Sequence, residues 1–328
     1  MSGVGVGAGL PVAQDDVLAA RETIGSRLHR TPLLSSATLS DRVGARVLLK
    51  AELFQRTGSF KPRGMLNALA HLDDEEKRAG VITISAGNAA QSLAYCAALE
   101  GIDCLVVMWQ GASQAKLDAT RGYGATVDLR AANPAEAFER LEELRVETGR
   151  AFVHSFDDPH LIAGHGTLGL EVLEDVPEVD AVLVPVGGGG LISGVAVAVK
   201  HARPGARVIA VEPERAPALN AALAAGEPVP VEPSSVADGL NAPFAGVNTL
   251  AICRQLVDDS LLVTEEEIRA AFRFLYERAK LACEPAGAAS TAALLSEKVE
   301  LERGSTVAVV VSGGNVAHQT AVAILDEQ

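Results

Sequence analysis

Residues 181–201, AVLVPVGGGGLISGVAVAVKH, decide the fold class of this chain. Ala181–Val186 is a short apolar run, which is typical of a strand buried on both faces of a parallel sheet. Four glycines follow it, and Leu191–His201 then reads as a buried helix. A buried strand that leads through glycines into a helix is part of a crossover unit. We therefore expect an α/β protein with parallel sheets.

The same alternation of elements continues along the chain. Short runs rich in Val, Ile and Leu alternate with amphipathic stretches, as expected when helices cover a mostly parallel sheet. Thr264 and Glu267 have the spacing of a capping box, which predicts that a helix begins at Glu265. The predicted strands are Val81–Ile84, Cys104–Met108, Ala125–Leu129, Ala181–Pro185, Val208–Val211 and Thr306–Val311, and the clearest predicted helices are Asn88–Leu99, Pro134–Thr148, Leu191–His201 and Glu265–Leu281.

The composition is that of a globular protein. Of 328 residues, 48% are hydrophobic and 21% are charged, so the chain can form a full core and is long enough for two domains. The net charge of −14 argues against a nucleic-acid surface, which needs a basic patch. No apolar run reaches membrane-spanning length, and residues 1–16 lack the features of a signal peptide. We expect residues 1–16 to form a flexible, glycine-rich tail and the protein to be cytoplasmic.

The four cysteines are scattered along the chain. Cys96, Cys104, Cys253 and Cys283 form no CxxC pair and show no regular spacing. The sequence therefore gives no signature of a disulfide framework or of a zinc site. We expect buried, reduced thiols.

Three glycine-containing segments follow predicted strands, where open parallel sheets place their ligands. They are Ser85–Asn88, Gly187–Gly190 and Ser312–Asn315. Free main-chain N–H groups at such positions bind anions. One glycine would serve for a simple turn, and the ordering entropy of four is costly. We therefore interpret Gly187–Gly190 as a phosphate cradle.

A dinucleotide-binding fold is the main alternative interpretation of this segment. Its fingerprint needs an acidic residue about twenty residues after the glycines. Glu212 lies near that distance after Gly190, so this segment alone does not decide the matter. The other segments argue against the alternative, above all Thr57–Gly64.

The segment Thr57–Gly64, TGSFKPRG, places Lys61 among small and turn-forming residues just before a predicted helix. A lone lysine is usually a solvated surface residue. Together with the other motifs, however, this segment resembles the fold-type II pyridoxal-phosphate (PLP) enzymes, specifically the threonine dehydratase and serine racemase branch. The resemblance runs from about His29 to about Gln319. It rests on ELFQ at 52–55, GSFK at 58–61, SAGN at 85–88 with Gln91, AGHGT at 163–167, the four glycines, ADG at 237–239, EPAG at 284–287 and SGGN at 312–315.

This resemblance implies an architecture. The fold would have two domains, as in the tryptophan synthase β-like enzymes, with parallel sheets covered by helices. Residues 1–53 together with 153–328 would form the large, PLP-binding domain, and residues 54–152 the small domain. The resemblance also implies a homodimer that acts on a small amino acid.

The resemblance further assigns residues to the cofactor ring. Lys61 would form the Schiff base with PLP and later remove the substrate α-proton. An amine suits both tasks, because it holds an aldehyde reversibly and is a base once displaced. Phe60 would cover one face of the ring, and Gly239 would leave room on the other. Asn88 would bond the phenolic oxygen.

Other residues would hold the remaining parts of the cofactor. Ser312 would meet the pyridine nitrogen, and because a hydroxyl cannot pair a pyridinium as a carboxylate does, the nitrogen would be neutral. A neutral ring favours elimination over transamination. Glu284 would either tune the site or cap the turn at Pro285. The phosphate would be cradled by Gly187, Gly188, Gly189, Gly190 and the amide of Leu191.

The substrate carboxylate would bind the loop formed by Ser85, Ala86, Gly87 and Asn88. This loop departs from the family pattern at two positions. Ala89 replaces the usual histidine, which makes room for a bulkier or differently charged β-hydroxy amino acid. Ala86 stands where the racemases carry a serine that reprotonates Cα, and alanine has no proton to give. This second departure favours a dehydratase over a racemase.

A cation site is also implied, but only in part. Glu212 and Ala216 match two ligands of the divalent-metal site of many relatives, whereas Ala218 replaces the third, an acid. With one carboxylate, a hard cation would need waters or other oxygens. Glu212 and Glu214 could equally be solvated surface residues. The sequence therefore does not favour a bound divalent or monovalent cation over an empty site.

The implied function is that of a PLP-dependent lyase. It would convert L-threonine or a similar β-hydroxy amino acid, such as L-serine, to a 2-oxo acid and ammonia. The alternatives are a serine racemase and a dehydratase of 3-hydroxyaspartate or phenylserine. Cysteine synthases, which perform β-replacement, usually have a different lysine context and a threonine-bearing loop. Lys61 and the intact glycine segment argue against a non-enzymatic sensor.

Overall fold

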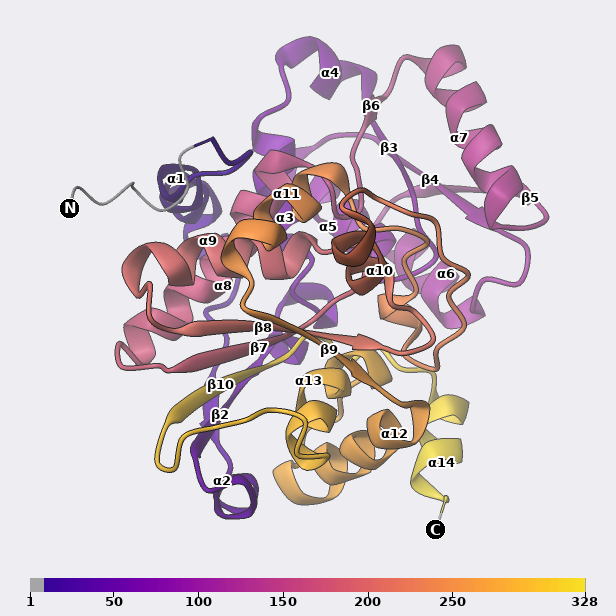
Figure 1. The fold of residues 1–328 in the computed structure, drawn as a ribbon. Helices are drawn as coiled ribbons and strands as arrows, with labels where there is room; N and C mark the ends of the chain where they lie inside the picture. Colours follow the sequence, from indigo (N-terminus) through magenta and orange to yellow (C-terminus); the bar gives the residue numbers. More distant parts are fainter. Residues whose placement is uncertain (1–8, 328) are drawn as a thin grey trace.

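The computed structural model describes residues 9–327, which form two β-sheets with helices packed on them (Figure 1). Residues 1–8 of the expected tail lie outside the described residues. Within the described residues, the prediction that the tail extends to residue 16 is wrong, because helix α1 (Gln14–Ile24) begins before that point. Asp15 and Asp16 lie in its first turn, where negative charge favours a helix N-terminus.

The larger sheet has six strands in the order β1-β2-β10-β7-β8-β9. All neighbours run parallel except β1, which pairs with β2 in the antiparallel direction. The central strands are buried along their length, as the apolar runs predicted. The strands are β1 (Leu33–Ser35), β2 (Arg46–Ala51), β10 (Thr306–Val311), β7 (Ala181–Pro185), β8 (Arg207–Pro213) and β9 (Asp259–Val263).

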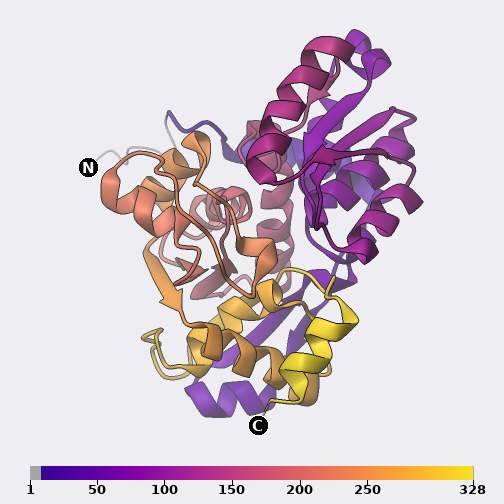
Figure 2. The same cartoon turned by 90° about the vertical axis from the view of Figure 1, so that its right-hand side faces the viewer.

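The smaller sheet has four parallel strands in the order β5-β4-β3-β6. All four lie within residues 54–152, and with their helices they occupy the upper right of Figure 2, apart from the larger sheet. The chain is therefore divided between the sheets as the two predicted domains require, although the boundaries themselves stay a prediction. The strands are β5 (Thr126–Ala131), β4 (Cys104–Trp109), β3 (Val81–Ile84) and β6 (Ala151–Phe152).

Each face of the larger sheet is covered by a separate apolar cluster, because side chains alternate between the two faces of a strand. On β7, for example, Val182 and Val184 belong to one cluster, and Ala181 and Leu183 to the other. The first face packs on α1, α8 (Pro159–Asp175), α9 (Gly190–Ala202), α10 (Ala218–Ala225) and α11 (Val247–Leu256). The second packs on α2 (Ala37–Val43), α12 (Glu265–Phe274), α13 (Pro285–Leu295) and α14 (His318–Leu325).

The smaller sheet is also covered on both faces. Val106 and Met108 of β4 face one cluster, whereas Leu105 and Val107 face the other. The first cluster includes residues of α3 (Pro62–Ala70), α5 (Asn88–Glu100) and α6 (Gln114–Gly122), and the second includes residues of α7 (Pro134–Thr148). Short helix α4 (Asp74–Ala79) leads into β3.

The elements predicted from the apolar runs are present. Strands β3, β7 and β10 match their predictions residue for residue, as does helix α7. The capping box also forms, because Thr264 and the side chain of Glu267 each accept a hydrogen bond from the other's main-chain N–H. The single helix predicted over 265–281 is wrong in its second half. Helix α12 ends at Phe274, a π-helical turn covers Leu275–Ala279, and Lys280 has a φ of 59°.

Helix α8 approaches two neighbouring helices at main-chain distance. A Cβ added to Gly164 would lie 2.3 Å from the main-chain oxygen of Arg63, at the start of α3. A Cβ added to Gly166 would lie 2.8 Å from the main-chain oxygen of Gly194 in α9. Glycine is therefore required at both positions of α8 for this close packing.

All four cysteines are buried and unpaired, as predicted. Cys96 of α5 and Cys104 of β4 belong to the smaller sheet's part of the chain, and Cys253 of α11 and Cys283 to the larger sheet's part. Burial raises the pKa of each thiol. Among the described residues, none of the helices is both long and apolar enough to span a bilayer.

Candidate active site

Lys61 lies at the junction between a loop and helix α3, whose first residue is Pro62. The preceding loop is tied to the end of strand β10, because the N–H of Phe60 donates to the main-chain oxygen of Ser312 at 3.1 Å. The Lys61 amine donates to the main-chain oxygen of Ser155 at 2.7 Å. Lys61 is partly exposed as a residue, but protein surrounds its amine, and this burial lowers its pKa to about 8 although the charge of Glu284 opposes the shift.

A buried ion network anchors the start of α3 two residues later. Arg63 is 1% exposed and donates to both carboxylate oxygens of Glu52, each at 2.9 Å. It also donates to both oxygens of Glu171 in α8, at 2.7 and 2.9 Å. Burial alone would lower the pKa of Arg63, but the two carboxylates reverse the direction and raise it. The network therefore holds a charged guanidinium that fixes α3 against α8 and the end of β2.

The segment that accepts the lysine hydrogen bond was not among the predicted site residues. His154 precedes Ser155, and its Nδ1 accepts from the N–H groups of Phe156 (3.1 Å) and Asp157 (2.9 Å). Burial, more than any neighbouring charge, lowers the pKa of His154, so the ring is neutral with its proton on Nε2. Asp157 in turn accepts from the N–H groups of Val247 and Thr249 at the start of α11. The polar residues that follow shortly after strand β6, which are His154, Ser155, Asp157 and Asp158, were the signal that could have located this segment.

The four glycines join β7 to α9, as predicted, but their number does not by itself indicate an anion site. A Cβ on Gly188 would lie 2.3 Å from the ring of Phe156, and one on Gly190 would lie 2.4 Å from its main-chain oxygen. Gly189 has a φ of 96°, and a Cβ on it would lie 2.9 Å from Thr249. A Cβ on Gly187 would lie 3.2 Å from the main chain of Leu240. Close packing within the protein is thus a sufficient reason for glycine here, and the phosphate cradle, with Leu191, stays a prediction.

Asn88, at the start of α5, joins a hydrogen-bonded cluster between the two sheets. Its amide donates to Oε1 of Glu284 at 2.7 Å, and its oxygen accepts from Asn315 at 2.8 Å. Asn315 also donates to the main-chain oxygen of Thr57 at 2.7 Å. Three of the motifs therefore meet here, beside the loop that carries Lys61. They are SAGN at 85–88, EPAG at 284–287 and SGGN at 312–315.

Glu284 is 2% exposed, and its Oε2 has no hydrogen-bond partner. It precedes Pro285 at the start of α13, but its side chain makes no capping hydrogen bond, so the capping interpretation is wrong. Burial and then the charge of Asp238 raise the pKa of Glu284 to about 7. Lys116, which forms an ion pair with Asp238, opposes this shift, as does Lys61.

Two glycines leave the space around this carboxyl open. A Cβ on Gly239 would lie 3.0 Å from that of Ala286 and 3.5 Å from Oε1 of Glu284. A Cβ on Gly313 would lie 2.6 Å from the same oxygen. Gly239 is thus beside Glu284 rather than remote from the predicted site. Its place against a ring face stays a prediction.

The loop predicted to bind a substrate carboxylate turns back on itself at the end of β3. Ser85 Oγ accepts from the N–H of Gly87 at 3.2 Å. Ala86 and Gly87 are half-buried, and a Cβ on Gly87 would meet no atom within 4 Å. The protein therefore leaves room beside this loop, whereas Ala89 is buried in the helix that follows.

These residues fit the PLP cofactor that the sequence implied. A buried amine of lowered pKa at Lys61 can hold an aldehyde. The unpartnered Oε2 of Glu284 is a buried polar atom that lacks a partner within the protein. The open space beside Gly87 gives access to a small substrate. Donors and acceptors at the ends of strands in both sheets thus converge on one region.

The candidate cation ligands lie elsewhere, at the end of β8. Glu212 is not a surface residue: it is fully buried and accepts from the N–H groups of Leu219 (2.7 Å) and Asn220 (2.8 Å) in α10. Burial raises the pKa of Glu212 to about 8, although those two hydrogen bonds oppose the shift. Ala216 is also buried, whereas Glu214 is exposed. Within residues 9–327, no group of three His, Cys, Asp or Glu side chains is arranged to hold a metal ion.

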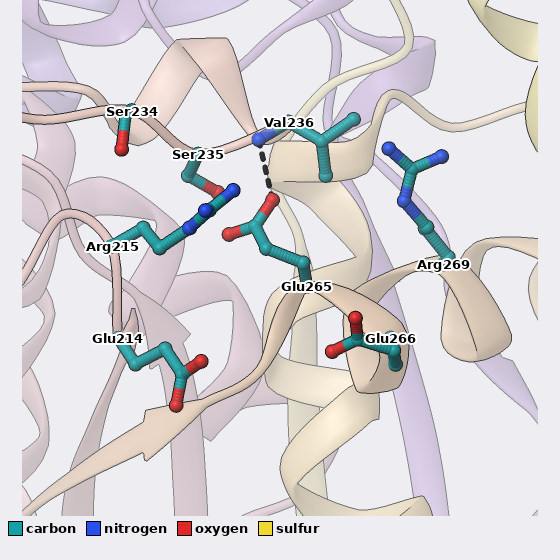
Figure 3. Close-up of a pocket in the computed structure, with 8 residues that line it drawn as sticks. All are labelled: Glu214, Arg215, Ser234, Ser235, Val236, Glu265, Glu266 and Arg269. Carbon is teal, nitrogen blue, oxygen red and sulfur yellow. Dashed lines mark hydrogen bonds between the residues drawn. The ribbon is translucent and has the colours of Figure 1, made fainter.

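A pocket of about 530 Å³ lies near the ends of β8 and β9 (Figure 3). It borders Ser234–Val236, just before Gly239, and the carboxylate of Glu265 stands at its centre and accepts from the N–H of Val236 at 2.6 Å. Apart from Val236, the side chains around it are charged or polar, and they do not include Lys61 or its partners. This pocket is therefore separate from the candidate active site. Its lining residues are Glu214, Arg215, Ser234, Ser235, Val236, Glu265, Glu266 and Arg269.

Comparison with known proteins agrees with this geometry. The family described as "Pyridoxal-phosphate dependent enzyme" matches residues 25–313. The chain is 44% identical over 306 residues to an L-threonine ammonia-lyase of Thermotoga maritima, covering 93% of this chain and 76% of the relative. It is 43% identical over 310 residues to a catabolic L-threonine dehydratase of Escherichia coli, covering 94% of each.

Solved structures show the same relationship. The structure of maize serine racemase has a TM-score of 0.91 at 37% identity and covers 95% of this chain and 96% of its own. A threonine deaminase from the organism abbreviated T.th. has a TM-score of 0.87 at 41% identity, covering 93% of this chain and 99% of its own. Both dehydratase-type and racemase-type proteins therefore share this fold.

Proposed function

The chain belongs to the pyridoxal-phosphate dependent enzymes, and from this premise we propose that it converts L-threonine or L-serine to a 2-oxo acid and ammonia. The family resemblance and the two-sheet α/β fold expected from the sequence are confirmed. The observation that carries the proposal is the convergence of the buried Lys61 amine with the Asn88–Glu284 pair beside an open loop. Relatives at 43–44% identity with threonine dehydratase activity in their names support the same reaction.

In this proposal Lys61 holds the cofactor aldehyde and then accepts the α-proton of the substrate. A pKa of about 8 supports both tasks, since a fraction of the amine is neutral near neutral pH. Bound PLP supplies an electron sink that lets the substrate lose its α-proton and β-hydroxyl. Water leaves and is then regained as ammonia departs, so the net products are one 2-oxo acid and one ammonia.

The other residues would bind and orient. We propose that the N–H groups and side chains of Ser85–Asn88 bind the substrate carboxylate. Phe60 and Gly239 would lie on opposite faces of the cofactor ring, and Ser312 would meet its nitrogen. The N–H groups of Gly187–Leu191 would bind its phosphate. Glu284, with a pKa of about 7 and a free Oε2, can hold a proton near the site at neutral pH.

A racemase is the second candidate, because maize serine racemase shares the fold over nearly the whole chain. Racemisation needs a second proton donor on the face of Cα opposite the lysine. Ala86 has no such proton. We therefore expect the wild-type enzyme to form almost no D-amino acid, and Ala86→Ser to raise racemisation relative to elimination. Chiral chromatography that shows D-serine accumulating as fast as pyruvate in the wild type would contradict the proposal.

One panel of assays tests the substrate. The enzyme is incubated separately with L-threonine, L-serine, 3-hydroxyaspartate and phenylserine, and 2-oxo acid and ammonia are measured. We expect equal amounts of both products from threonine or serine. Products from 3-hydroxyaspartate or phenylserine alone would mean that the open space beside Gly87 takes another substrate, and no product from any would refute the dehydratase.

Three further features belong to the same proposal. We propose a homodimer, which analytical ultracentrifugation would test, and a cytoplasmic location, which fractionation of the source cells would test. A cation bound at Glu212 and Ala216 would need ligands beyond those two residues. It is not required by the chemistry proposed for Lys61.

A further inference from the structure

The short 3-10 turn η4 (Asp238–Leu240) borders the candidate active site. It carries Gly239, which lies beside Glu284, since a Cβ on Gly239 would lie 3.5 Å from Oε1 of that residue. The main chain of Leu240 packs on Gly187, the first of the four glycines, where an added Cβ would lie 3.2 Å from it. This turn therefore touches both the buried carboxyl and the predicted phosphate cradle.

The loop that carries η4 is fixed at its base by residues of the larger sheet's part of the chain. The N–H of Ser235 donates to Oδ1 of Asn241 at 3.1 Å, and Nδ2 of Asn241 donates to the main-chain oxygen of Ser235 at 2.9 Å. The N–H of Val236 donates to Glu265 of α12 at 2.6 Å (Figure 3). These three hydrogen bonds hold the two ends of the loop, and none of them involves a residue of η4 itself.

The turn is held from the other part of the chain, by Lys116 of α6. The amine of Lys116 forms an ion pair with the carboxylate of Asp238, and within residues 9–327 this is the only hydrogen bond of either side chain. The Lys116 side chain is 15% exposed, so protein encloses most of it, whereas that of Asp238 is 55% exposed. Helix α6 packs in the smaller sheet's part of the chain, and η4 packs in the larger sheet's part. The ion pair thus joins the two parts one residue away from Gly239.

We propose that Lys116 is a positioning residue of the candidate active site, which by binding Asp238 holds η4, and with it Gly239 and Leu240, in the place that cofactor binding requires. Because the base of the loop is fixed separately, loss of the ion pair frees the turn without unfolding the loop. Lys116 itself needs no contact with cofactor or substrate. The inference rests on the proposed function only in that Gly239 and the four glycines border the cofactor.

Substitutions at both ends of the ion pair separate positioning from an effect of charge alone. Lys116→Met keeps a long unbranched side chain without its charge, Asp238→Ala removes the carboxylate, and the double variant removes the pair with no change in net charge. If the pair positions η4, all three variants lose the same contact and are impaired alike. If the two charges act only through space on Glu284, the single variants shift its pKa in opposite directions, and the double variant returns toward the wild type.

Two further variants on α6 serve as controls. Lys116→Arg keeps a cation that can bind the carboxylate of Asp238. Arg121→Met removes a positive charge from an exposed residue of the same helix. For every variant, PLP binding to the cofactor-free enzyme is followed by visible absorption. Hydrogen exchange at residues 236–241 of the cofactor-free protein is followed by mass spectrometry, and urea unfolding measures stability.

A partly exposed ion pair sets the size of the expected effect. The PLP dissociation constant should rise about fivefold in each single variant and in the double variant, and should stay within about twofold of the wild type in Lys116→Arg and Arg121→Met. Exchange at residues 236–241 should become about threefold faster in the same three variants. Wild-type affinity in Lys116→Met or in Asp238→Ala would overturn the proposal, so either variant decides the matter if the other does not fold. Recovery of affinity in the double variant, or unchanged exchange at residues 236–241, would overturn it as well.

This test is independent of the reaction, because PLP binding and hydrogen exchange are measured without substrate. If the panel of hydroxy amino acids gives no product, the affinities still decide the role of Lys116. If the panel gives oxo acid and ammonia but the double variant binds PLP as the wild type does, only the role of Lys116 is refuted.

Discussion

Lys61 and Glu284 are both enclosed by protein, and burial moves each pKa toward neutrality, to about 8 and about 7. Each charge favours ionisation of the other, but neither has enough partners to restore its ordinary pKa. Such groups are a cost to the folded state and are typical of sites that perform proton chemistry. Two residue-scale predictions follow from them.

The first concerns the lysine. Lys61→Ala should abolish the visible absorption of bound cofactor and lower turnover by more than about a thousandfold, since the residue serves as both anchor and base. The matched control is Lys77→Ala on α4, which should keep both properties. Absorption spectra and oxo-acid assays measure the outcome. Retention of colour and activity in Lys61→Ala would mean that another lysine holds the cofactor.

The second concerns the glutamate and the pH. The folded-state pKa of Glu284 is raised from 4.5 to about 7, so its neutral form favours folding below pH 4.5, and this contribution is lost as the pH rises to 7. We compare the two proteins without cofactor. As the pH rises from 5 to 8, the unfolding free energy of the wild type should therefore fall by up to about 3 kcal/mol more than that of Glu284→Gln. Urea titrations at each pH measure this. Parallel curves for the two proteins would show that Glu284 is not buried as described.

At the scale of elements, the junction of β7 and α9 is held by contacts that the sequence does not display. Gly188→Ala would place a Cβ against the ring of Phe156, and we expect it to destabilise the protein by about 1–3 kcal/mol. Gly205→Ala is the control, because a Cβ there meets nothing within 4 Å and the change should stay within about 0.5 kcal/mol. Urea unfolding of both variants tests this. A neutral Gly188→Ala would show that the ring of Phe156 moves aside at no cost.

The same scale shows what the sequence could predict. Strands β3, β7 and β10 are short, apolar and flanked by glycine, so their residues alone identified them. Strands β1 and β9 lie at the edges of the larger sheet and are only partly buried, so they lack a continuous apolar run. Strand β6 has two residues, too few for any periodic pattern.

The residues of the candidate site could be predicted where they belong to a motif. Contacts between residues that lie far apart along the chain could not. Lys61, Asn88 and Glu284 could be named from family motifs. That Asn88 bonds Glu284, 196 residues away, depends on how the two sheets meet. His154 has no motif, because it acts through two main-chain N–H groups of its own loop. Phe156 was missed for a similar reason, since only packing brings it against Gly188.

At the scale of the whole molecule, the carboxyl ends of strands from both sheets supply the site, whereas the candidate cation ligands lie elsewhere, at the end of β8. Among the described residues no three potential metal ligands converge. The carboxylate of Glu212 accepts hydrogen bonds from two main-chain N–H groups at the start of α10. We therefore expect exhaustive chelation to leave most of the activity intact. Assays before and after treatment with a chelator measure this. Complete loss that magnesium alone restores would show that other oxygens complete a cation site near Glu212.

The four buried thiols can report transient local unfolding of the folded protein, because they lie in different parts of the chain. Two of them lie in the part of the chain that forms the smaller sheet and two in the part that forms the larger. A thiol reagent can react only when the surrounding elements separate transiently, so labelling kinetics in native buffer report sub-global unfolding free energies. Mass spectrometry of partly labelled protein would then reveal whether the parts of the chain that form the two sheets unfold independently or as one cooperative unit. No engineered probe is needed.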